Sequence, residues 1–381
     1  MPFYQRRGSV PLKKHTVFRK PNGGIYYEEL VSRNGFSDMY STLYHLRMPT
    51  CIHEIDQFIE QPILEYKGRH RNRHIKTNEL KISGDAFTGR VPLFFNKDLI
   101  ISKAHIDRNM EYLYRNGHYD ELIYVQKGKA NLRSNFGDLK VQEGDYLVIP
   151  RGIIWKMNCK ENIHALIIES NSPIRTPKKY RNQYGQHLEH SPFCERDFKV
   201  PKFIDPLNIE EKTKVRVRLR GGYQDMIYAH NPFDVIGWDG CYYPWKININ
   251  DFEPIVGSLH QPPPVHQTFE SSGFVICSFV NRILDFHPDS IPSPYPHSNV
   301  DSDEIIFYSK GNFISRKGVN AESITFHPCG LPHGPQPGKY EDSIGKSRTE
   351  EIAVMIDTFK PLSLAISISE IDDYKYLKSW L

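Results

Sequence analysis

Two histidines and one glutamate near the C-terminus have the residue types and the spacing of a metal site. His297, Glu304 and His333 lie within 37 residues of one another. The apolar run at 305–308, before Gly311, is predicted to be a strand. Such a strand can carry His297 and Glu304 toward one interior, and a later antiparallel strand can bring His333 beside them. Two imidazoles and one carboxylate leave coordination positions open, which is the donor set of non-haem Fe(II) oxygenases.

The spacing around these residues is typical of cupins, which are small antiparallel barrels that can hold a metal inside. Residues 297–311 match the first cupin motif, G-x5-HxH-x(3,4)-E-x6-G, with Asn299 in place of the second histidine and no leading glycine. Residues 328–333 match the core of the second motif, G-x5-PxG-x2-H, but Glu322 stands at the leading glycine. The joint spacing of three ligand types favours a metal site over ordinary surface or core histidines.

Several further segments make the chain resemble the homogentisate 1,2-dioxygenase family over nearly its whole length, most closely the shorter bacterial members. The segments are 4–8 (YQRRG), 15–19 (HTVFR), 26–30 (YYEEL), 44–46 (YHL), 273–280 (GFVICSFV), 297–304, 311–313 (GNF) and 331–335 (LPHGP). The resemblance implies an Fe(II)-dependent enzyme that cleaves the ring of homogentisate with O2 and gives maleylacetoacetate, in tyrosine and phenylalanine catabolism. It also implies a homo-oligomer, a trimer or a hexamer.

The resemblance assigns roles to particular histidines. Iron would be held by His297, Glu304 and His333, and His333 would also contact the substrate. His260 opens a proline-rich turn at the position of the active-site base, where a neutral imidazole can take the proton of a substrate phenol. His266 follows closely, and we expect a structural role for it.

The substrate is expected to contact three further residues, namely Tyr295, Phe313 and His327. His327 lies six residues before His333, where it can orient a ligand or the substrate by hydrogen bonding. In longer family members a tyrosine falls at the position of Phe313, so the hydroxyl group is lost here. Arg316 or Lys317 can instead bind the substrate carboxylate.

Three alternatives stay open. Asp303 is a rival to Glu304 as the carboxylate ligand, because this chain has one more residue after His297 than the longer members, although Glu304 keeps the spacing to Gly311. The substrate can be another dihydroxyaromatic acid. The protein can also be a non-enzymatic cupin that binds a metal or a ligand.

Composition describes a globular protein long enough for two cores. The chain has 381 residues, 39% of them hydrophobic and 25% charged, with a formal net charge of +4. The basic stretch 67–76 (KGRHRNRHIK) lacks the aromatic platforms or the reading helix of a nucleic-acid site. We expect this stretch to be a solvated loop or a subunit contact, and the substrate to be a small molecule.

The cellular location is expected to be the cytoplasm. No stretch has the roughly 18 apolar residues of a membrane span, and the N-terminus, MPFYQRR, lacks the apolar core of a signal peptide. The six cysteines are scattered without a CxxC pair, which favours free thiols in a reducing compartment.

Short apolar runs between prolines and glycines predict an all-β fold of two jelly-roll (cupin) barrels with a short C-terminal helix at 367–381. Predicted strands include 121–127, 145–150 and 165–169. A degenerate repeat supports two barrels, because residues 121–128 echo 304–311 and residues 144–158 match the second cupin motif. Trp155 replaces the ligand histidine there, and its indole cannot donate a lone pair. The first barrel is therefore expected to be metal-free.

The expected organisation has four parts. An N-terminal arm with strands occupies 1–80, and the degenerate cupin occupies 81–175. A connecting region rich in proline and aromatic residues spans 176–245, where large aromatics predict a buried packing layer. The iron-binding cupin and its tail occupy 246–381.

Overall fold

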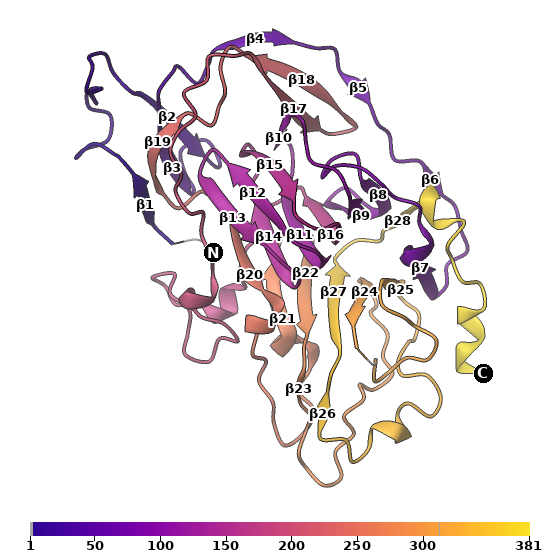
Figure 1. Cartoon of the computed structure of the whole chain (residues 1–381). Coiled ribbons are helices and arrows are strands. Elements are labelled where there is room, and N and C mark those ends of the chain that lie inside the picture. Colours follow the sequence, from indigo (N-terminus) through magenta and orange to yellow (C-terminus); the bar gives the residue numbers. More distant parts are fainter. Residues whose placement is uncertain (1–2, 312) are drawn as a thin grey trace.

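A computed structural model describes residues 3–311 and 313–381, so Met1, Pro2 and Asn312 lie outside the described residues. Strands dominate it (Figure 1). The predicted strands are confirmed at β11 (Asp120–Lys127), β14 (Asp145–Ile149) and β16 (Ile163–Ser170). No described residue belongs to an α-helix.

The first barrel is built from two large sheets. One sheet has the order β20 (Trp245–Asn248), β14, β11, β16, β9 (Leu99–Ile106), β8 (Arg90–Phe95), β28 (Ser363–Ala365) and β6 (Glu65–Tyr66). The other has the order β13 (Gly137–Val141), β12 (Ala130–Ser134), β15 (Ile154–Cys159), β10 (Leu113–Asn116), β17 (Thr213–Leu219), β18 (Gly222–Tyr228) and β4 (Ile52–Ile55), and β5 (Ile59–Glu60) also pairs with β18.

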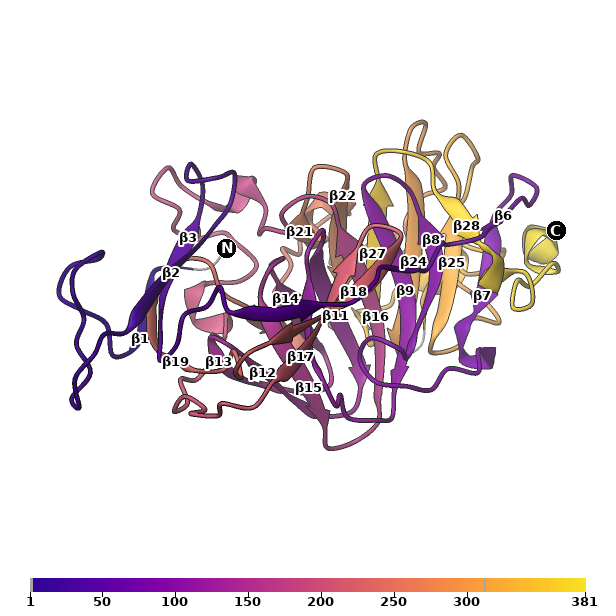
Figure 2. The same cartoon turned by 90° about the horizontal axis from the view of Figure 1, so that it is seen from above.

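The second barrel is built on a six-stranded sheet that lies beside the first barrel (Figures 1 and 2). Its order is β21 (Gln267–Glu270), β22 (Phe274–Phe279), β27 (Ile352–Thr358), β24 (Asp303–Lys310), β25 (Ser323–His327) and β7 (Arg73–Lys76). A short pair, β23 (Arg282–Ile283) with β26 (Arg348–Thr349), extends it below. A strand from near the N-terminus therefore completes the sheet that carries Glu304.

A separate four-stranded sheet carries the N-terminal arm (Figure 2). Its order is β1 (Gln5–Gly8), β19 (Val235–Gly240), β3 (Tyr40–His45) and β2 (Tyr27–Ser32). The remaining elements are 3-10 turns, namely η1 (Thr77–Glu79), η2 (Lys178–Tyr180), η3 (Glu195–Asp197), η4 (Ile249–Asp251), η5 (Pro263–His266), η6 (Glu341–Ser343), η7 (Ile366–Ile368) and η8 (Tyr376–Trp380).

The two barrels share one core. Tyr124 on β11 and Tyr146 on β14 are buried, and their hydroxyl groups hydrogen-bond to Ser309 at 2.8 Å and Ser278 at 2.9 Å across the barrel interface. The β11 strand is covered on both faces, which explains its nearly unbroken apolar sequence. Within the aromatic region 176–245, Trp238 and Tyr243 are fully buried, whereas most of residues 181–214 are exposed or half-buried.

The interior of the first barrel is filled by protein side chains. Trp155 is fully buried and packs edge-on against Tyr114, with ring centroids 4.9 Å apart. Glu121, which corresponds to Glu304 in the repeat, forms an ion pair with Arg90 at 2.5 Å. An arginine guanidinium therefore compensates the charge of this buried carboxylate.

Glu322, which replaces the leading glycine of the second cupin motif, clamps the two barrels together. Its φ of 67° lies in the left-handed region that favours glycine. Its carboxylate reaches Lys103 of β9 at 2.8 Å and His164 of β16 at 2.9 Å. These inter-barrel contacts compensate the backbone cost of a glutamate at this position.

The Glu322 clamp makes stability depend on pH. Burial alone would raise the pKa of Glu322, but the hydrogen bond from His164 and the charge of Lys103 outweigh it and lower the pKa to about 2. A carboxylate with a lowered folded pKa adds stability above its unfolded pKa, and this stability is lost as pH falls from about 4.5 toward 2. We expect the melting temperature of wild type to exceed that of Glu322→Gln at pH 6, and the gap to narrow below pH 4. A gap that does not change with pH would contradict this role.

The expectation for the C-terminal tail is wrong, and the expectation for the basic stretch is wrong in part. The tail forms only the 3-10 turns η7 and η8 instead of a helix, because Asp372 between them pairs with Ile75 in a β-bridge and its extended backbone interrupts helical bonding. In the basic stretch, residues 67–70 are exposed as expected of a solvated loop, but residues 71–76 are buried or half-buried and include β7, and a subunit contact stays a prediction. Arg71 and Arg73 are buried and both donate to the carboxylate of Asp372.

No helical element in the described part of the chain is long and apolar enough to span a membrane. All six cysteines are free thiols.

Candidate metal centre

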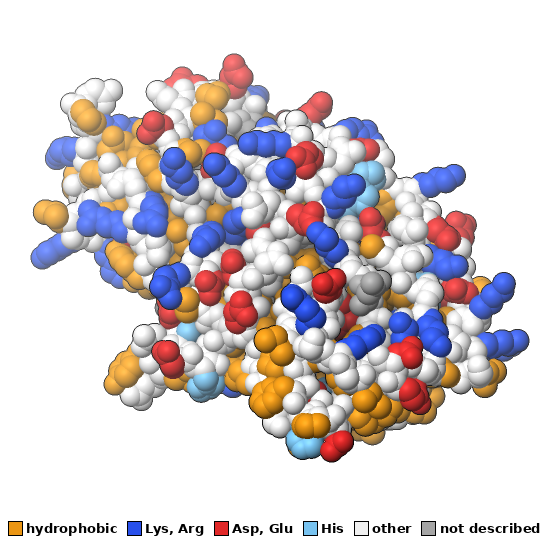
Figure 3. Space-filling view, turned by 60° about the horizontal axis from the view of Figure 1, so that its bottom comes forward, with side chains coloured by type: hydrophobic (Ala, Val, Ile, Leu, Met, Phe, Trp, Pro, Cys, Tyr) orange, Lys and Arg blue, Asp and Glu red, His pale blue; other side chains and the backbone are white. Residues whose placement is uncertain are grey.

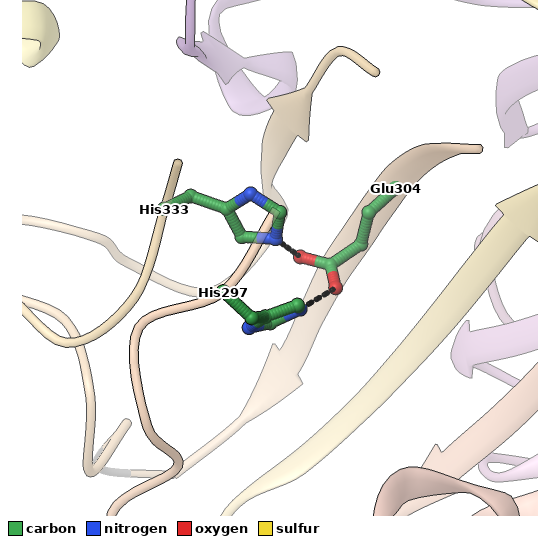
Figure 4. A group of neighbouring side chains, drawn as sticks. All are labelled: His297, Glu304 and His333. Atoms are coloured by element: carbon green, nitrogen blue, oxygen red, sulfur yellow. Dashed lines mark ion pairs between the residues drawn. The ribbon is translucent and has the colours of Figure 1, made fainter. Parts of the chain in front are cut away.

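Backbone pairing brings His297 and His333 together. The two residues form an isolated antiparallel bridge in which each backbone N–H donates to the other residue's carbonyl, at 2.8 and 2.9 Å. Directly opposed residues of an antiparallel pair project their side chains on the same face, and the two imidazole centroids lie 4.3 Å apart. Glu304, the second residue of β24, lies across from them (Figure 4).

The ligand atoms of His297, Glu304 and His333 all lie within 4.8 Å of one another. Both imidazoles point toward the carboxylate, with Nε2 of His297 at 3.9 Å from Oε2 and Nε2 of His333 at 3.4 Å from Oε1 (Figure 4). The sequence-predicted ligands therefore converge on one point.

Hydrogen bonds to the backbone indicate which ring nitrogen of His297 and of His333 is the acceptor that faces Glu304. Nδ1 of His297 lies 3.3 Å from the carbonyl of Tyr295, and Nδ1 of His333 lies 3.2 Å from the carbonyl of Leu331. A carbonyl only accepts, so each Nδ1 carries the proton and each Nε2 directs its lone pair toward Glu304. Nε2 of His333 is buried and has no hydrogen-bond partner. Two lone pairs and a carboxylate that face one another fit a bound cation.

His327 orients the carboxylate and does not line the pocket, so the expectation of a substrate contact is corrected. Its Nδ1 lies 2.7 Å from Oε1 of Glu304, and its fully buried ring stacks on His333 with centroids 4.4 Å apart. Burial lowers the pKa of His327 to about 4, so the ring is neutral and Nδ1–H donates to the carboxylate. Burial alone would raise the pKa of Glu304, but the hydrogen bond from His327 outweighs it and holds the pKa well below its usual range.

Asp303 faces the other side of β24, as adjacent strand residues do. Its Oδ1 accepts the backbone N–H of Cys329 and its Oδ2 accepts that of Leu362, both at 2.7 Å. The structure therefore places Glu304 with the two histidines and gives Asp303 a loop-holding role. Asn299 holds the loop through its carbonyl, which accepts the N–H of Gly330 at 2.7 Å.

A pocket opens directly onto the three ligands and carries the proposed base. His260 lines it, and its Nδ1 lies 3.8 Å from Oδ2 of Asp285. Burial and the charge of Arg282 lower the pKa of His260 despite Asp285, so the imidazole is neutral near pH 7. His266 lines the same wall, where burial lowers its pKa to about 3.

Two of the expected substrate contacts lie away from the pocket centre. Tyr295 is 53% exposed, with its ring 5.4 Å from that of His260, and it belongs to an outer depression next to the pocket. Phe313 is buried behind Tyr308, with ring centroids 4.5 Å apart, and does not line the pocket. Tyr308 lines the pocket where Phe313 was expected. Residues 304, 306 and 308 alternate along one face of β24, and this alternation predicts that Tyr308 faces the pocket.

Exposed apolar side chains surround the lower end of the second barrel. Figure 3 shows hydrophobic side chains gathered along the lower edge of this face. Ile283 in β23 and the loop residues Leu259, Phe286 and Ile344 are each more than half exposed.

Arg316, and not Lys317, lies on the pocket wall. Arg316 is 6% exposed, and its Nη1 donates to the carbonyl of Gly334 at 2.6 Å. Among the described residues it has no ion-pair partner within 4.0 Å. Burial lowers its pKa, but Tyr308, Tyr376 and Glu304 outweigh this effect and raise it, so the guanidinium keeps its charge. The Nζ of Lys317 donates instead to the carbonyl of Pro337.

The all-β fold and the cluster of two histidines and one carboxylate place this chain in the class of two-barrel cupin proteins with a candidate metal site. A family model described as the N-terminal part of homogentisate 1,2-dioxygenase matches residues 85–249, which contain the first barrel. A protein of Saccharolobus solfataricus named as a "putative dioxygenase" is 43% identical and covers 100% of this chain and 99% of its own length. The chain belongs to the homogentisate 1,2-dioxygenase family.

Relatives that carry the enzyme's name are more distant. The homogentisate 1,2-dioxygenase of Dictyostelium discoideum is 25% identical, over 84% of this chain and 78% of its own length. That of Bradyrhizobium diazoefficiens is 24% identical, and the match spans 64% of this chain but about half, 54%, of the relative. Among solved structures, a cupin barrel protein of Leptotrichia buccalis matches 78% of this chain at 11% identity, with a TM-score of 0.37.

Proposed function

We propose that this protein is an Fe(II)-dependent ring-cleaving dioxygenase that converts homogentisate and O2 into maleylacetoacetate in tyrosine and phenylalanine catabolism. The observation that carries the proposal is the convergence of two imidazole lone pairs and the Glu304 carboxylate at the floor of a pocket. The pocket also contains a neutral histidine and a buried arginine without an ion-pair partner. The three metal ligands therefore lie beside a proton acceptor for a phenol and a positive charge for a carboxylate.

His297, Glu304 and His333 would hold the iron. When bound, Fe(II) orients an aromatic substrate and O2 and makes electron transfer between them possible. The chain contributes the geometry, because the backbone bridge fixes both imidazoles and His327 fixes the carboxylate. Ligands held in this way lose little freedom when the metal binds.

Arg316 would bind the carboxylate of the substrate. A buried charge without a partner is costly, and the nearest anion among the metal ligands, Glu304, is engaged with histidines. A substrate carboxylate supplies the missing countercharge. Arg316, with Tyr308 beside it, thereby takes over the substrate contact that Phe313 cannot make.

Replacing Arg316 with methionine is expected to raise KM for homogentisate about 10- to 100-fold, since a hydrogen bond to a charged group contributes about 1.5–3 kcal/mol. Arg316 also donates to the carbonyl of Gly334, next to His333, so KM is compared at equal iron content. Lys317→Met is the matched control and should behave like wild type. If Arg316→Met leaves KM unchanged, another residue binds the carboxylate.

His260 would accept the phenol proton. Replacing it with alanine should leave iron binding intact and slow turnover about 10²- to 10⁴-fold, the usual contribution of a placed proton acceptor. The loss should shrink as pH rises, because a substrate that is already deprotonated needs less help. Iron content and the pH–rate profile are the measurements, and His190→Ala is the control, because His190 is exposed and does not line the pocket. Iron loss would instead make His260 a ligand, and unchanged kinetics at neutral pH would remove it from the chemistry.

One alternative substrate class is a related dihydroxyaromatic acid, because the relatives named homogentisate 1,2-dioxygenase are only 24% and 25% identical to this chain. Oxygen uptake by the anaerobically Fe(II)-loaded protein, measured with homogentisate, gentisate and 3,4-dihydroxyphenylacetate, separates the candidates. We expect the highest kcat/KM with homogentisate. Faster uptake with another acid would reassign the substrate, and stable iron binding without uptake on any acid would favour a non-enzymatic metal-binding cupin.

We further propose a cytoplasmic homo-oligomer, a trimer or a hexamer, whose catalytic unit is the region 246–381 and whose first barrel binds no metal. The free thiols are compatible with a reducing compartment. Light scattering of the purified protein measures the assembly size.

A further inference from the structure

The C-terminal tail lies against the metal centre, on the side away from the pocket. The tail ends in η8, which packs beside β7 (Figure 1) and reaches His327 of β25 through Tyr376. Tyr376 in η8 is 4% exposed, and its ring packs on His74 and on Trp380, with centroids 5.6 and 5.0 Å away. The last turn of the chain is therefore part of the packed structure around the site.

A continuous polar chain runs from Tyr376 to the carboxylate ligand. The Tyr376 hydroxyl lies 3.4 Å from Nε2 of His327, whose Nδ1 lies 2.7 Å from Glu304. Because Nδ1–H donates to the carboxylate, Nε2 is the acceptor of the neutral ring and receives the tyrosine proton. The hydroxyl thus holds His327 in the tautomer and orientation that Glu304 needs.

A second contact reaches the segment that carries His333. The indole N–H of Trp380 donates to the carbonyl of Gly334 at 3.3 Å, and Arg316 donates to the same carbonyl at 2.6 Å. Beside it, the amide of Gln336 donates to the hydroxyl of Ser379 at 2.6 Å. The tail therefore touches both the residue after a metal ligand and the partner of the proposed substrate anchor.

The tail is itself fixed to the basic stretch. Asp372 accepts from Arg71 at 2.7 Å and also from Arg73. The same stretch reaches the ligand loop, where Asn72 donates to the carbonyl of Pro332 at 3.3 Å and His70 lies 3.0 Å from the carbonyl of Cys329. Residues 327–334 are thus held by segments from both ends of the chain.

We propose that the C-terminal tail is a positioning element of the metal centre, in which the Tyr376 hydroxyl sets Glu304 through His327 and the Trp380 indole sets the backbone that carries His333. This inference rests on the proposed function, since it assumes that the three side chains bind iron. Neither residue touches the pocket, so both act through other residues.

Equilibrium binding of Co²⁺, used as a spectroscopic substitute for Fe²⁺, tests the proposal without turnover. Tyr376→Phe and Trp380→Phe keep an aromatic ring and remove only the hydrogen-bonding group. Losing such an outer partner typically weakens metal binding about 10- to 100-fold, and we expect losses of this size together with an altered visible Co²⁺ spectrum. Tyr374→Phe is the matched control, because its hydroxyl also bonds a tyrosine, Tyr66 at 3.0 Å, but is exposed and remote from the ligands.

The variant His333→Ala distinguishes the role of the tail from the existence of the metal site. Loss of Co²⁺ binding in His333→Ala, with wild-type affinity and spectrum in both tail variants, would overturn the tail's role and leave the metal site standing. Wild-type binding by His333→Ala would overturn the site itself. Melting of the metal-free variants shows whether the proteins are folded, and a folded Trp380→Phe carries the test if Tyr376→Phe unfolds.

Discussion

Replacing His333 with alanine is expected to remove most of the bound iron and all detectable ring cleavage. His297 and Glu304 alone would then face the metal, and two protein ligands compete poorly with water for Fe(II). The loss of metal affinity should exceed about 100-fold, the upper range for residues that only support a ligand. Elemental analysis after anaerobic loading and desalting gives the iron content, and oxygen uptake gives the activity.

His266→Gln is the matched control for His333→Ala, because His266 lines the same pocket but lies outside the ligand group. It should retain near-stoichiometric iron. The same iron content in His333→Ala would remove His333 from the coordination of the metal.

The second large effect is expected at Glu304. Glu304→Gln removes the negative charge that balances Fe(II) and leaves one acceptor oxygen, which His327 already engages, so activity should fall by more than about 100-fold, beyond the loss of a supporting partner. Asp303→Asn should remain active but unfold at lower temperature. Its carboxylate accepts two backbone N–H groups, and an amide can accept only one, which leaves a buried donor unpaired at a cost of about 1–3 kcal/mol.

Activity and melting temperature of the two variants are measured side by side. An inactive Asp303→Asn beside a nearly normal Glu304→Gln would mean that the register of β24 at the metal is displaced by one residue.

The ligand group could be predicted because its spacing follows from simple strand geometry. His297 precedes β24, Glu304 lies at its start, and His333 follows β25. Because β24 and β25 pair in an antiparallel manner, the cupin spacing places the three residues together. In the first barrel, Trp155 is buried against Tyr114, and the absence of a metal there stays a prediction. The β architecture followed from short apolar runs between turn residues.

Other features depend on contacts between distant segments, which local patterns do not encode. The sequence around Arg71 and Arg73 predicts exposed charges. In the structure both side chains are buried because they bind Asp372, about 300 residues later. The tail has a helix-like charge pattern, but its β-bridge to Ile75 prevails over that propensity. The family resemblance places Phe313 at the pocket, whereas strand alternation from Glu304 puts Tyr308 there.

The most direct test of the central claim is the fate of the two oxygen atoms. The anaerobically Fe(II)-loaded protein is mixed with homogentisate under 18O2, and the uptake of oxygen and the mass of the product are measured. A ring-cleaving dioxygenase consumes one O2 per homogentisate and places both labelled atoms in a ring-opened product with the mass of maleylacetoacetate. No uptake above that of His333→Ala, or a rapidly quenched product without any labelled atom, would contradict the account.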